Sequence, residues 1–244
     1  MLPGYTRVNL RPLGINMRLP RVWRGSSKLI YVFREAYEPE LALLRDLLRP
    51  GSVTIDVGAN YGIYSATAAR FSGDQGVVYA FEPSLHAFSV LVMNSERNAP
   101  SRINMERLAV ASITGAGQLS VHRDSSRNVL RRAGELGGQT ESVHCIELDR
   151  YIAEKQLTRV DLIKVDVEGA EELVLRGAAE TIDRFRPVII FEVNPDGARR
   201  LGLQESGAWN LLAERRYSLH LAESGALRPV TSPPPSGNVV ALPA

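Results

Sequence analysis

Two acidic residues stand at the ends of apolar runs, and a glycine-containing turn lies between them. Asp56 belongs to the run VTIDV, Gly58 and Gly62 follow it, and Glu82 comes directly after the next run, VVYAF. Glycines allow a ligand to approach the backbone closely, and the first N–H groups of a following helix carry partial positive charge. An acid after the second strand of a parallel sheet is placed to accept hydrogen bonds from ribose hydroxyls. Together these residues predict a site for a nucleoside-containing cofactor.

The composition of the turn indicates which cofactor it is. A dinucleotide fingerprint is G-x-G-x-x-G, whereas this turn reads G-A-N-Y-G and has Asn60 where the second glycine would stand. A carboxylate ahead of the turn, Asp56, suits a ligand with an ammonium or sulfonium group and suits a pyrophosphate poorly. S-adenosylmethionine carries both cations and no phosphate. Two alternatives stay open, an NAD(P)-dependent oxidoreductase and a catalytically inactive nucleoside-binding module, because one fold can serve all three functions.

A second group of carboxylates ends two later apolar runs. In DLIKVDVEG, strand alternation places Asp166 and Glu168 on the same side, and IIFEV brings Glu192 to the end of a neighbouring strand. Burial or crowding raises the pKa of a carboxyl group and makes it a better base, and methyl transfer to a hydroxyl needs a group that accepts the proton. Asp166 is the first candidate for that base, with Glu168 and Glu192 as the others.

A structural interpretation of the same acids is equally open. Asp166 would then only hydrogen-bond the cofactor, and Glu168 would cap the helix that begins near Ala170. Clustered carboxylates can also bind Mg²⁺. No further ligand motif supports a metal, so Mg²⁺ stays open as an alternative and we assign no metal ligands.

Alternating strand and helix patterns would position these residues. Apolar runs of strand length alternate with helical patterns, which favours a parallel sheet with right-handed crossovers and helices on both faces, a doubly wound α/β fold. The predicted strands are 53–57, 77–81, 103–110, 160–167 and 187–193, and the predicted helices are 62–71, 84–98, 170–179 and 205–216.

The rest of the chain has weaker patterns. Residues 111–145 predict two short strands around a polar loop, and 217–224 and 237–244 predict a closing strand pair. A helical pattern covers 38–48. We therefore divide the chain into an N-terminal extension and helix, 1–50, which would cover the substrate, and a cofactor-binding domain, 51–244.

Several motifs in order resemble the FkbM-type methyltransferases. They are DVGANYGIYS, FEP, LAVAS, LIKVDVEGAE and IIFEVNP. The resemblance implies a Rossmann-like class I methyltransferase with a mostly parallel seven-stranded sheet whose last strand is antiparallel, S-adenosylmethionine as cofactor, and O-methylation of a sugar or natural product. It also implies a ribose contact for Glu82, an adenine border made by Ala109 and Val110, and a methionine end lined by Asp56, Gly58, Asn60 and Gly62. Asp166 would lie beside the same cofactor.

Composition limits the remaining function classes. The chain has 244 residues, 44% of them apolar, and a net charge of +2, which does not indicate polyanion binding. The first 50 residues hold nine Lys and Arg against four Asp and Glu, which we interpret as a solvated surface. No apolar run approaches ~20 residues, and the single cysteine, Cys145, excludes an intramolecular disulfide. We therefore expect a cytoplasmic enzyme that acts on a small molecule or glycan hydroxyl, with no nucleic-acid or membrane partner.

Overall fold

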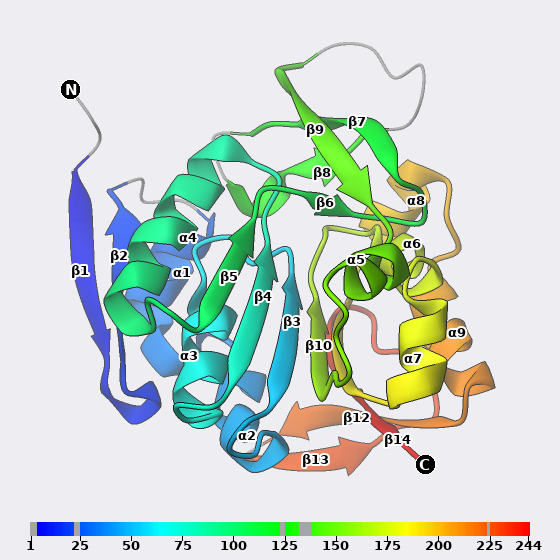
Figure 1. Cartoon of the computed structure of the whole chain (residues 1–244). Helices are drawn as coiled ribbons and strands as arrows, with labels where there is room; N and C mark the ends of the chain where they lie inside the picture. The colour runs from blue at the N-terminus through cyan, green and yellow to red at the C-terminus, as the bar shows by residue number, and fades with distance from the viewer. Residues whose placement is uncertain (1–3, 22–24, 123–124, 132–137, 224) are drawn as a thin grey trace.

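A computed structural model describes residues 4–21, 25–122, 125–131, 138–223 and 225–244, and its centre is an eight-stranded sheet (Figure 1). The strand order is β13-β12-β14-β11-β10-β3-β4-β5. Five neighbouring strands are parallel, as the alternation of strands and helices predicts: β3 (Val53–Val57), β4 (Val77–Phe81), β5 (Ile103–Glu106), β10 (Leu162–Val165) and β11 (Val188–Val193).

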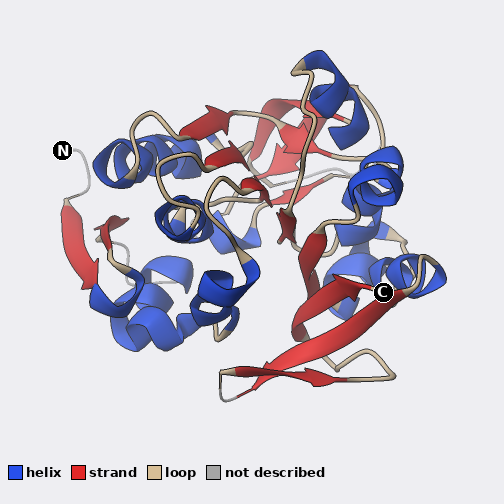
Figure 2. Ribbon diagram, turned by 60° about the horizontal axis from the view of Figure 1, so that its bottom comes forward, coloured by secondary structure: helices blue, strands red, loops and turns tan. Residues whose placement is uncertain are grey.

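Helices cover both faces of this sheet, so the predicted doubly wound arrangement is confirmed (Figure 2). Successive strand residues face opposite sides: Leu162 and Ile190 pack in one apolar cluster, Ile163 and Ile189 in the other. The first cluster includes helices α2 (Glu40–Leu47), α3 (Ile63–Phe71) and α4 (Leu85–Asn98). The second includes α5 (Leu148–Glu154), α6 (Glu171–Arg176), α7 (Ala179–Phe185) and α9 (Gly207–Glu214).

The predicted helix 170–179 is wrong in its extent, because the helix is interrupted at Gly177, between α6 and α7. A Cβ on Gly177 would lie 2.1 Å from the carbonyl oxygen of Ala111, so only glycine lets the two segments approach. The short helix α8 (Pro195–Leu201) follows β11 and begins with a proline, whose fixed φ suits a first helical turn.

The structure has one strand more at the end of the chain than the predicted pair. β14 (Gly237–Pro243) lies between β11 and β12 (Tyr217–Glu223) and runs antiparallel to both, which is the antiparallel last strand that the resemblance implies. The additional strand β13 (Ala226–Pro229) pairs with the free edge of β12 after a turn at Gly225, whose φ is +79°. The sheet therefore has eight strands and not seven.

A second, four-stranded sheet is formed by the middle of the chain. Its order is β6 (Ala109–Val110), β9 (Thr140–Ile146), β7 (Gly115–Ser120) and β8 (Val129–Leu130). The predicted strand 103–110 is therefore divided: its first half pairs with β4 and its last two residues pair with β9. The two predicted strands of 111–145 are β7 and β9. Parts of the polar loop between them, 123–124 and 132–137, lie outside the described residues.

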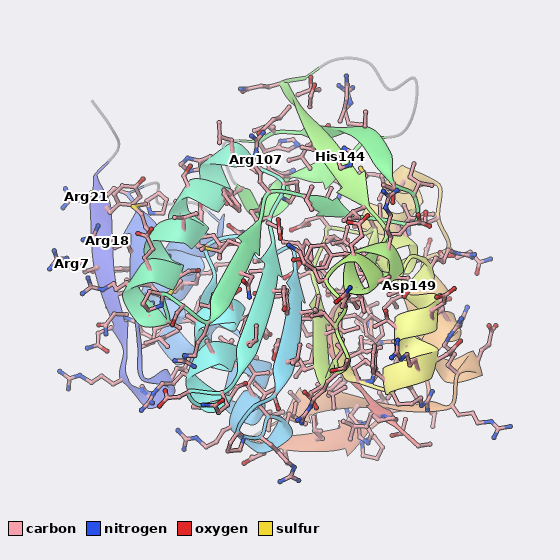
Figure 3. The ribbon with its side chains drawn as sticks, viewed as in Figure 1. Arg7, Arg18, Arg21, Arg107, His144 and Asp149 are labelled. Atoms are coloured by element: carbon pink, nitrogen blue, oxygen red, sulfur yellow. The ribbon has the colours of Figure 1, made fainter. Side chains whose placement is uncertain are left out.

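The N-terminal segment begins with a hairpin that the sequence analysis did not predict. β1 (Tyr5–Leu10) and β2 (Ile15–Pro20) turn their apolar residues toward α3 and α4 and share one core with them. Asn94 and Asn98 of α4 hold the backbone of β2 through hydrogen bonds to residues 16 and 18. Arg7 and Arg18, paired across the hairpin, and Arg21 lie on its outer side, as Figure 3 shows.

Helix α1 (Gly25–Phe33), the 3₁₀ helix η2 (Arg34–Tyr37) and α2 complete this segment. Helix α2 confirms the helical pattern of 38–48. In the part of the chain that the structure describes, no helix combines the length and apolar character needed to cross a membrane.

Candidate active site

One cavity of about 230 Å³ lies at the carboxyl ends of the central parallel strands. The N-terminal segment contributes Ser26 and Ile30 to its wall, and the second sheet contributes Leu119 and Leu130. Nine of the residues predicted from the sequence line it: Asp56, Gly58, Asn60, Glu82, Ala109, Val110, Asp166, Glu168 and Glu192. The ends of parallel strands thus bring residues far apart in sequence to one place.

The turn after β3 is shaped by two glycines in the left-handed region. Gly58 has φ +80°, and the N–H groups of Gly58 and Ala59 both donate to the carbonyl oxygen of Phe81 in β4. Gly62 has φ +83° and caps the start of α3. A Cβ on Gly62 would lie 2.7 Å from Leu91, so this glycine packs against α4 and is not part of the cavity wall.

Glu82 is held in the cavity wall by backbone groups. Its Oε2 accepts from the N–H of Asn60 and its Oε1 from the N–H of Ser84, each at 2.9 Å. Only 6% of the residue is exposed, and this burial raises the pKa of the carboxyl group to about 7. Each carboxylate oxygen keeps a further lone pair, so Glu82 is oriented and still able to accept hydrogen bonds from a ligand.

Asp56 is buried beneath the turn. Its Oδ2 accepts a hydrogen bond from the hydroxyl of Ser65 in α3, and burial raises the pKa of the carboxyl group to about 6. The acid therefore ties β3 to the first turns of α3 and presents a fixed partial or full negative charge to the cavity.

Asp166 directly follows β10 and pairs with a buried lysine. The Lys164 Nζ lies 3.6 Å from Asp166 Oδ2, donates to Asn238 Oδ1 at 2.8 Å, and sits 4.9 Å from the centre of the Tyr64 ring. Lys164 is 1% exposed, so these contacts compensate an otherwise unsolvated charge. Sequence reasoning missed Asn238, because it stands 74 residues from Lys164 and carries no local signal.

The predicted alternation of Asp166 and Glu168 along one strand is wrong. The strand ends at Val165, and Glu168 has φ +58°, a left-handed backbone that reorients its side chain. Glu168 nevertheless reaches the cavity because Gly169 packs directly on Gly197 of α8: a Cβ on Gly169 would lie 2.2 Å from the Gly197 carbonyl carbon.

Glu168 and Glu192 are bridged by one amide. The Asn194 Nδ2 donates to Glu192 Oε2 at 3.1 Å and lies 3.4 Å from Glu168 Oε2, while its Oδ1 accepts from the N–H of Gly197 and caps α8. Burial first, and then nearby acids, raises the pKa of each carboxyl group to about 8. The arrangement favours a proton on this pair at neutral pH when no cation is near.

The cap that the sequence analysis considered for Glu168 is wrong, because α6 has no side-chain cap at its N-terminus and Glu171 instead holds the loop that precedes it. Glu171 Oε1 accepts from the N–H groups of Val167 and Gly169, each at 3.1 Å, and burial raises its pKa to about 7. The loop between β10 and α6 is therefore held from within, and Glu168 is left facing the cavity.

The chemistry of the wall fits an adenosyl sulfonium. Leu108, Ala109 and Val110 form an apolar stretch of the kind that borders an adenine, while Glu82 and Asp56 supply oriented acids. Among the described residues, Lys164 is the only Lys or Arg in the lining, and its partners lie within the protein, so no free cation is present for a pyrophosphate. The described residues also contain no group of three or more His, Cys, Asp or Glu arranged to hold a metal.

The fold and the position of the cavity are those of a class I methyltransferase. A solved O-methyltransferase from Bacillus cereus, in complex with S-adenosylhomocysteine, is similar with a TM-score of 0.51 and 15% identity, covering 92% of this chain and 84% of that one. The family is shown by the sequence, because the model of the methyltransferase FkbM domain matches residues 56–219. The chain belongs to the FkbM family of S-adenosylmethionine-dependent methyltransferases.

Two relatives are similar over most of their length. The 31-O-demethyl-FK506 methyltransferase FkbM of Streptomyces tacrolimicus is 27% identical over an alignment of 199 residues, and 69% of this chain and 76% of that protein are covered. The hexuronic acid methyltransferase AglP of Haloferax volcanii is 27% identical over 184 residues, covering 75% of this chain and 70% of that protein.

Proposed function

We propose that this enzyme methylates a hydroxyl oxygen on a sugar or natural product. The observation that carries the proposal is that one cavity has Glu82 and Asp56 at one part of its wall and Asp166, Glu168 and Glu192 at another. The names of two relatives add support, since one acts on 31-O-demethyl-FK506 and the other on a hexuronic acid.

In this proposal Glu82 accepts the ribose hydroxyls, Ala109 and Val110 border the adenine, and Asp56 faces the cationic end of the cofactor. When bound, S-adenosylmethionine supplies a methyl group on its sulfonium, and a carbon–oxygen bond to the acceptor replaces the carbon–sulfur bond. The protein must then place the hydroxyl about 3 Å from that carbon and accept its proton.

Asp166 is the carboxylate that we propose as the base. It is the acid of the second group that lies against the glycine turn, because its carbonyl oxygen touches Gly58. One third of its side chain is exposed, so an acceptor hydroxyl could reach it, and Lys164 holds it in place. Glu168 and Glu192 remain the alternatives.

The N-terminal segment is proposed to cover the acceptor. Tyr37 and Glu38 line the cavity from η2 and the residue after it, opposite the carboxyl ends of the strands. Burial raises the pKa of Glu38 to about 7. Residues 51–244 would bind the cofactor, and this segment would exclude water from the reacting groups.

Calorimetric titration with S-adenosylhomocysteine and with NADH tests the cofactor, and transfer of a labelled methyl group to sugar and metabolite extracts tests the reaction. We expect micromolar or tighter binding of S-adenosylhomocysteine, no comparable binding of NADH, and a labelled product that is stable to base, as a methyl ether is. Labelling should persist in the presence of EDTA. Tight NADH binding, or cofactor binding without any transfer, would contradict the proposal.

A further inference from the structure

The cavity wall carries far more acidic than basic side chains. Among the described residues its only basic side chain is Lys164, against six acids: Glu38, Asp56, Glu82, Asp166, Glu168 and Glu192. These acids come from separate elements, the segment after η2, β3, the end of β4, the loop after β10, and β11. Their convergence is therefore a property of the tertiary structure and not of one acidic stretch.

The single lysine does not balance the acids at the acceptor end. Its ammonium group is already shared by Asn238 and Asp166 and lies over the ring of Tyr64. Lys164 is almost completely buried, so little of its side chain is accessible to an acceptor. Arg200 is the cation that lowers the pKa of Glu168, but it does not line the cavity, and its Nε donates to the carbonyl of Asp196.

Glu168 and Glu192 share a single hydrogen-bond donor among the described residues. Asn194 is the only hydrogen-bond donor that the described residues offer to either carboxyl group, and its contact with Glu168 is long, 3.4 Å. Both side chains are half-buried and share one neutral amide, and neither forms an ion pair with a described residue, although Lys164 lowers the pKa of Glu192 and Arg200 that of Glu168. A cation bound between them would supply the partner that charges removed from water require. The cofactor contributes one net positive charge, and in the proposed arrangement Asp56 faces it.

We propose that the methyl acceptor carries an ammonium group, which Glu168 and Glu192 bind while the neighbouring hydroxyl is methylated. This inference rests on the proposed function, since it assigns a substrate class to the same cavity. A primary ammonium has three donors, enough to bind both carboxylates at once. It stays protonated like a lysine side chain, so it is the recognised group and the oxygen is the nucleophile. A carboxylated acceptor would meet repulsion.

Three glycosides that differ only at carbon 6 test the charge preference. The probes are methyl 6-amino-6-deoxyglucoside, methyl glucoside and methyl glucuronide, titrated into the full chain saturated with S-adenosylhomocysteine. We expect the ammonium probe to bind at least about tenfold more tightly than the hydroxyl probe, because hydrogen bonds between charged groups are the stronger kind. The glucuronide should bind most weakly. Equal binding, a preference for the glucuronide, or binding of none of the three would overturn the inference.

Substitutions of Glu168 and Glu192 test whether these residues cause the preference for the ammonium probe. Glu192→Gln and Glu168→Gln should each reduce the ratio between the ammonium and hydroxyl probes, whereas Glu214→Gln, at an exposed position of α9 outside the cavity, should leave the ratio unchanged. An unchanged ratio in both cavity variants would also overturn the inference. Affinity for S-adenosylhomocysteine and labelled transfer to any acceptor report the proposed function separately, so failure of one proposal is distinguishable from failure of the other.

Discussion

The backbone carbonyl of Asp166 touches Gly58 so closely that a Cβ at Gly58 would lie 1.8 Å from the carbonyl oxygen. This contact joins the turn after β3 to the loop after β10, and it holds the proposed cofactor acids and the proposed base at a fixed separation. No side chain fits there, and the φ of Gly58, +80°, also disfavours any residue but glycine.

Gly58→Ala should therefore weaken both the fold and the cofactor site. We expect a lower free energy of unfolding and at least tenfold weaker binding of S-adenosylhomocysteine, measured by denaturant titration and calorimetry. Gly73→Ala is the matched control, because Gly73 has φ +65° but nothing within 4 Å of a Cβ, so only the backbone cost of about 1–2 kcal/mol applies. Equal effects of the two substitutions would count against the contact.

Glu82→Ala should reduce the affinity for S-adenosylhomocysteine by about 1.5–3 kcal/mol, the usual value of hydrogen bonds to a charged group. The substitution removes the proposed acceptor of two ribose hydroxyls and also releases the N–H groups of Asn60 and Ser84. Glu141→Ala is the control, since Glu141 lies near Glu82 but outside the cavity lining. Unchanged affinity in Glu82→Ala would refute the ribose assignment.

The Asp166→Asn substitution distinguishes two roles of Asp166, that of catalytic base and that of a residue that only binds the cofactor. If Asp166 accepts the proton, cofactor binding should survive while turnover falls by roughly 10²–10⁴. A residue that only holds the cofactor would give weaker cofactor binding with turnover at saturation nearly intact. Glu168→Gln and Glu192→Gln are measured alongside, because either could be the base. More than about a tenth of the original turnover, at saturating S-adenosylmethionine with an identified acceptor, would exclude Asp166 as the base.

The raised pKa values of Glu168 and Glu192 predict how stability depends on pH. In the folded protein both carboxyl groups bind protons up to about pH 8, whereas the ordinary value is 4.5, so the folded state holds more protons between these limits. Their contribution to stability is therefore constant below about pH 4.5, falls as the pH rises, and levels off above about pH 8.

Glu192→Gln tests this dependence, because glutamine resembles the protonated carboxyl group at every pH. Relative to the original protein, the variant should gain stability between about pH 5 and pH 8.5 in denaturant titrations without cofactor. The other charged groups that act on the pair are Asp166, Glu171, Lys164 and Arg200, and the substitution leaves all of them in place. A stability difference between Glu192→Gln and the original protein that does not change with pH would contradict the prediction.

Part of the fold and part of the site follow from local sequence patterns. Asp56 and Glu82 could be placed because each stands at the end of a short apolar run, and the ends of neighbouring parallel strands meet at one edge whatever the details of packing. The glycines of the turn and the alternation of strands with helices are equally local signals. These local signals were sufficient to predict the class of fold, the cofactor and the parallel strands of the sheet.

The hairpin of residues 5–20 and the edge strand β13 could have been found only in part. Apolar residues alternate in both β1 and β2, which is a signal for strands. A two-stranded hairpin is marginally stable by itself, however, and here α4 provides the core and two asparagines that hold it. β13 depends on the unpaired edge that β12 presents.

Only the tertiary structure decided how the proposed acceptor end of the cavity is built. Sequence alternation placed Glu168 beside Asp166, but a left-handed backbone at Glu168 and the packing of Gly169 on Gly197 set its position. Lys164 donates a hydrogen bond to Asn238, which stands 74 residues further along the chain. No local sequence pattern encodes this contact. The sequence by itself thus determined which acids end the strands, while long-range packing determined which of them are neutralised and which are left facing the cavity.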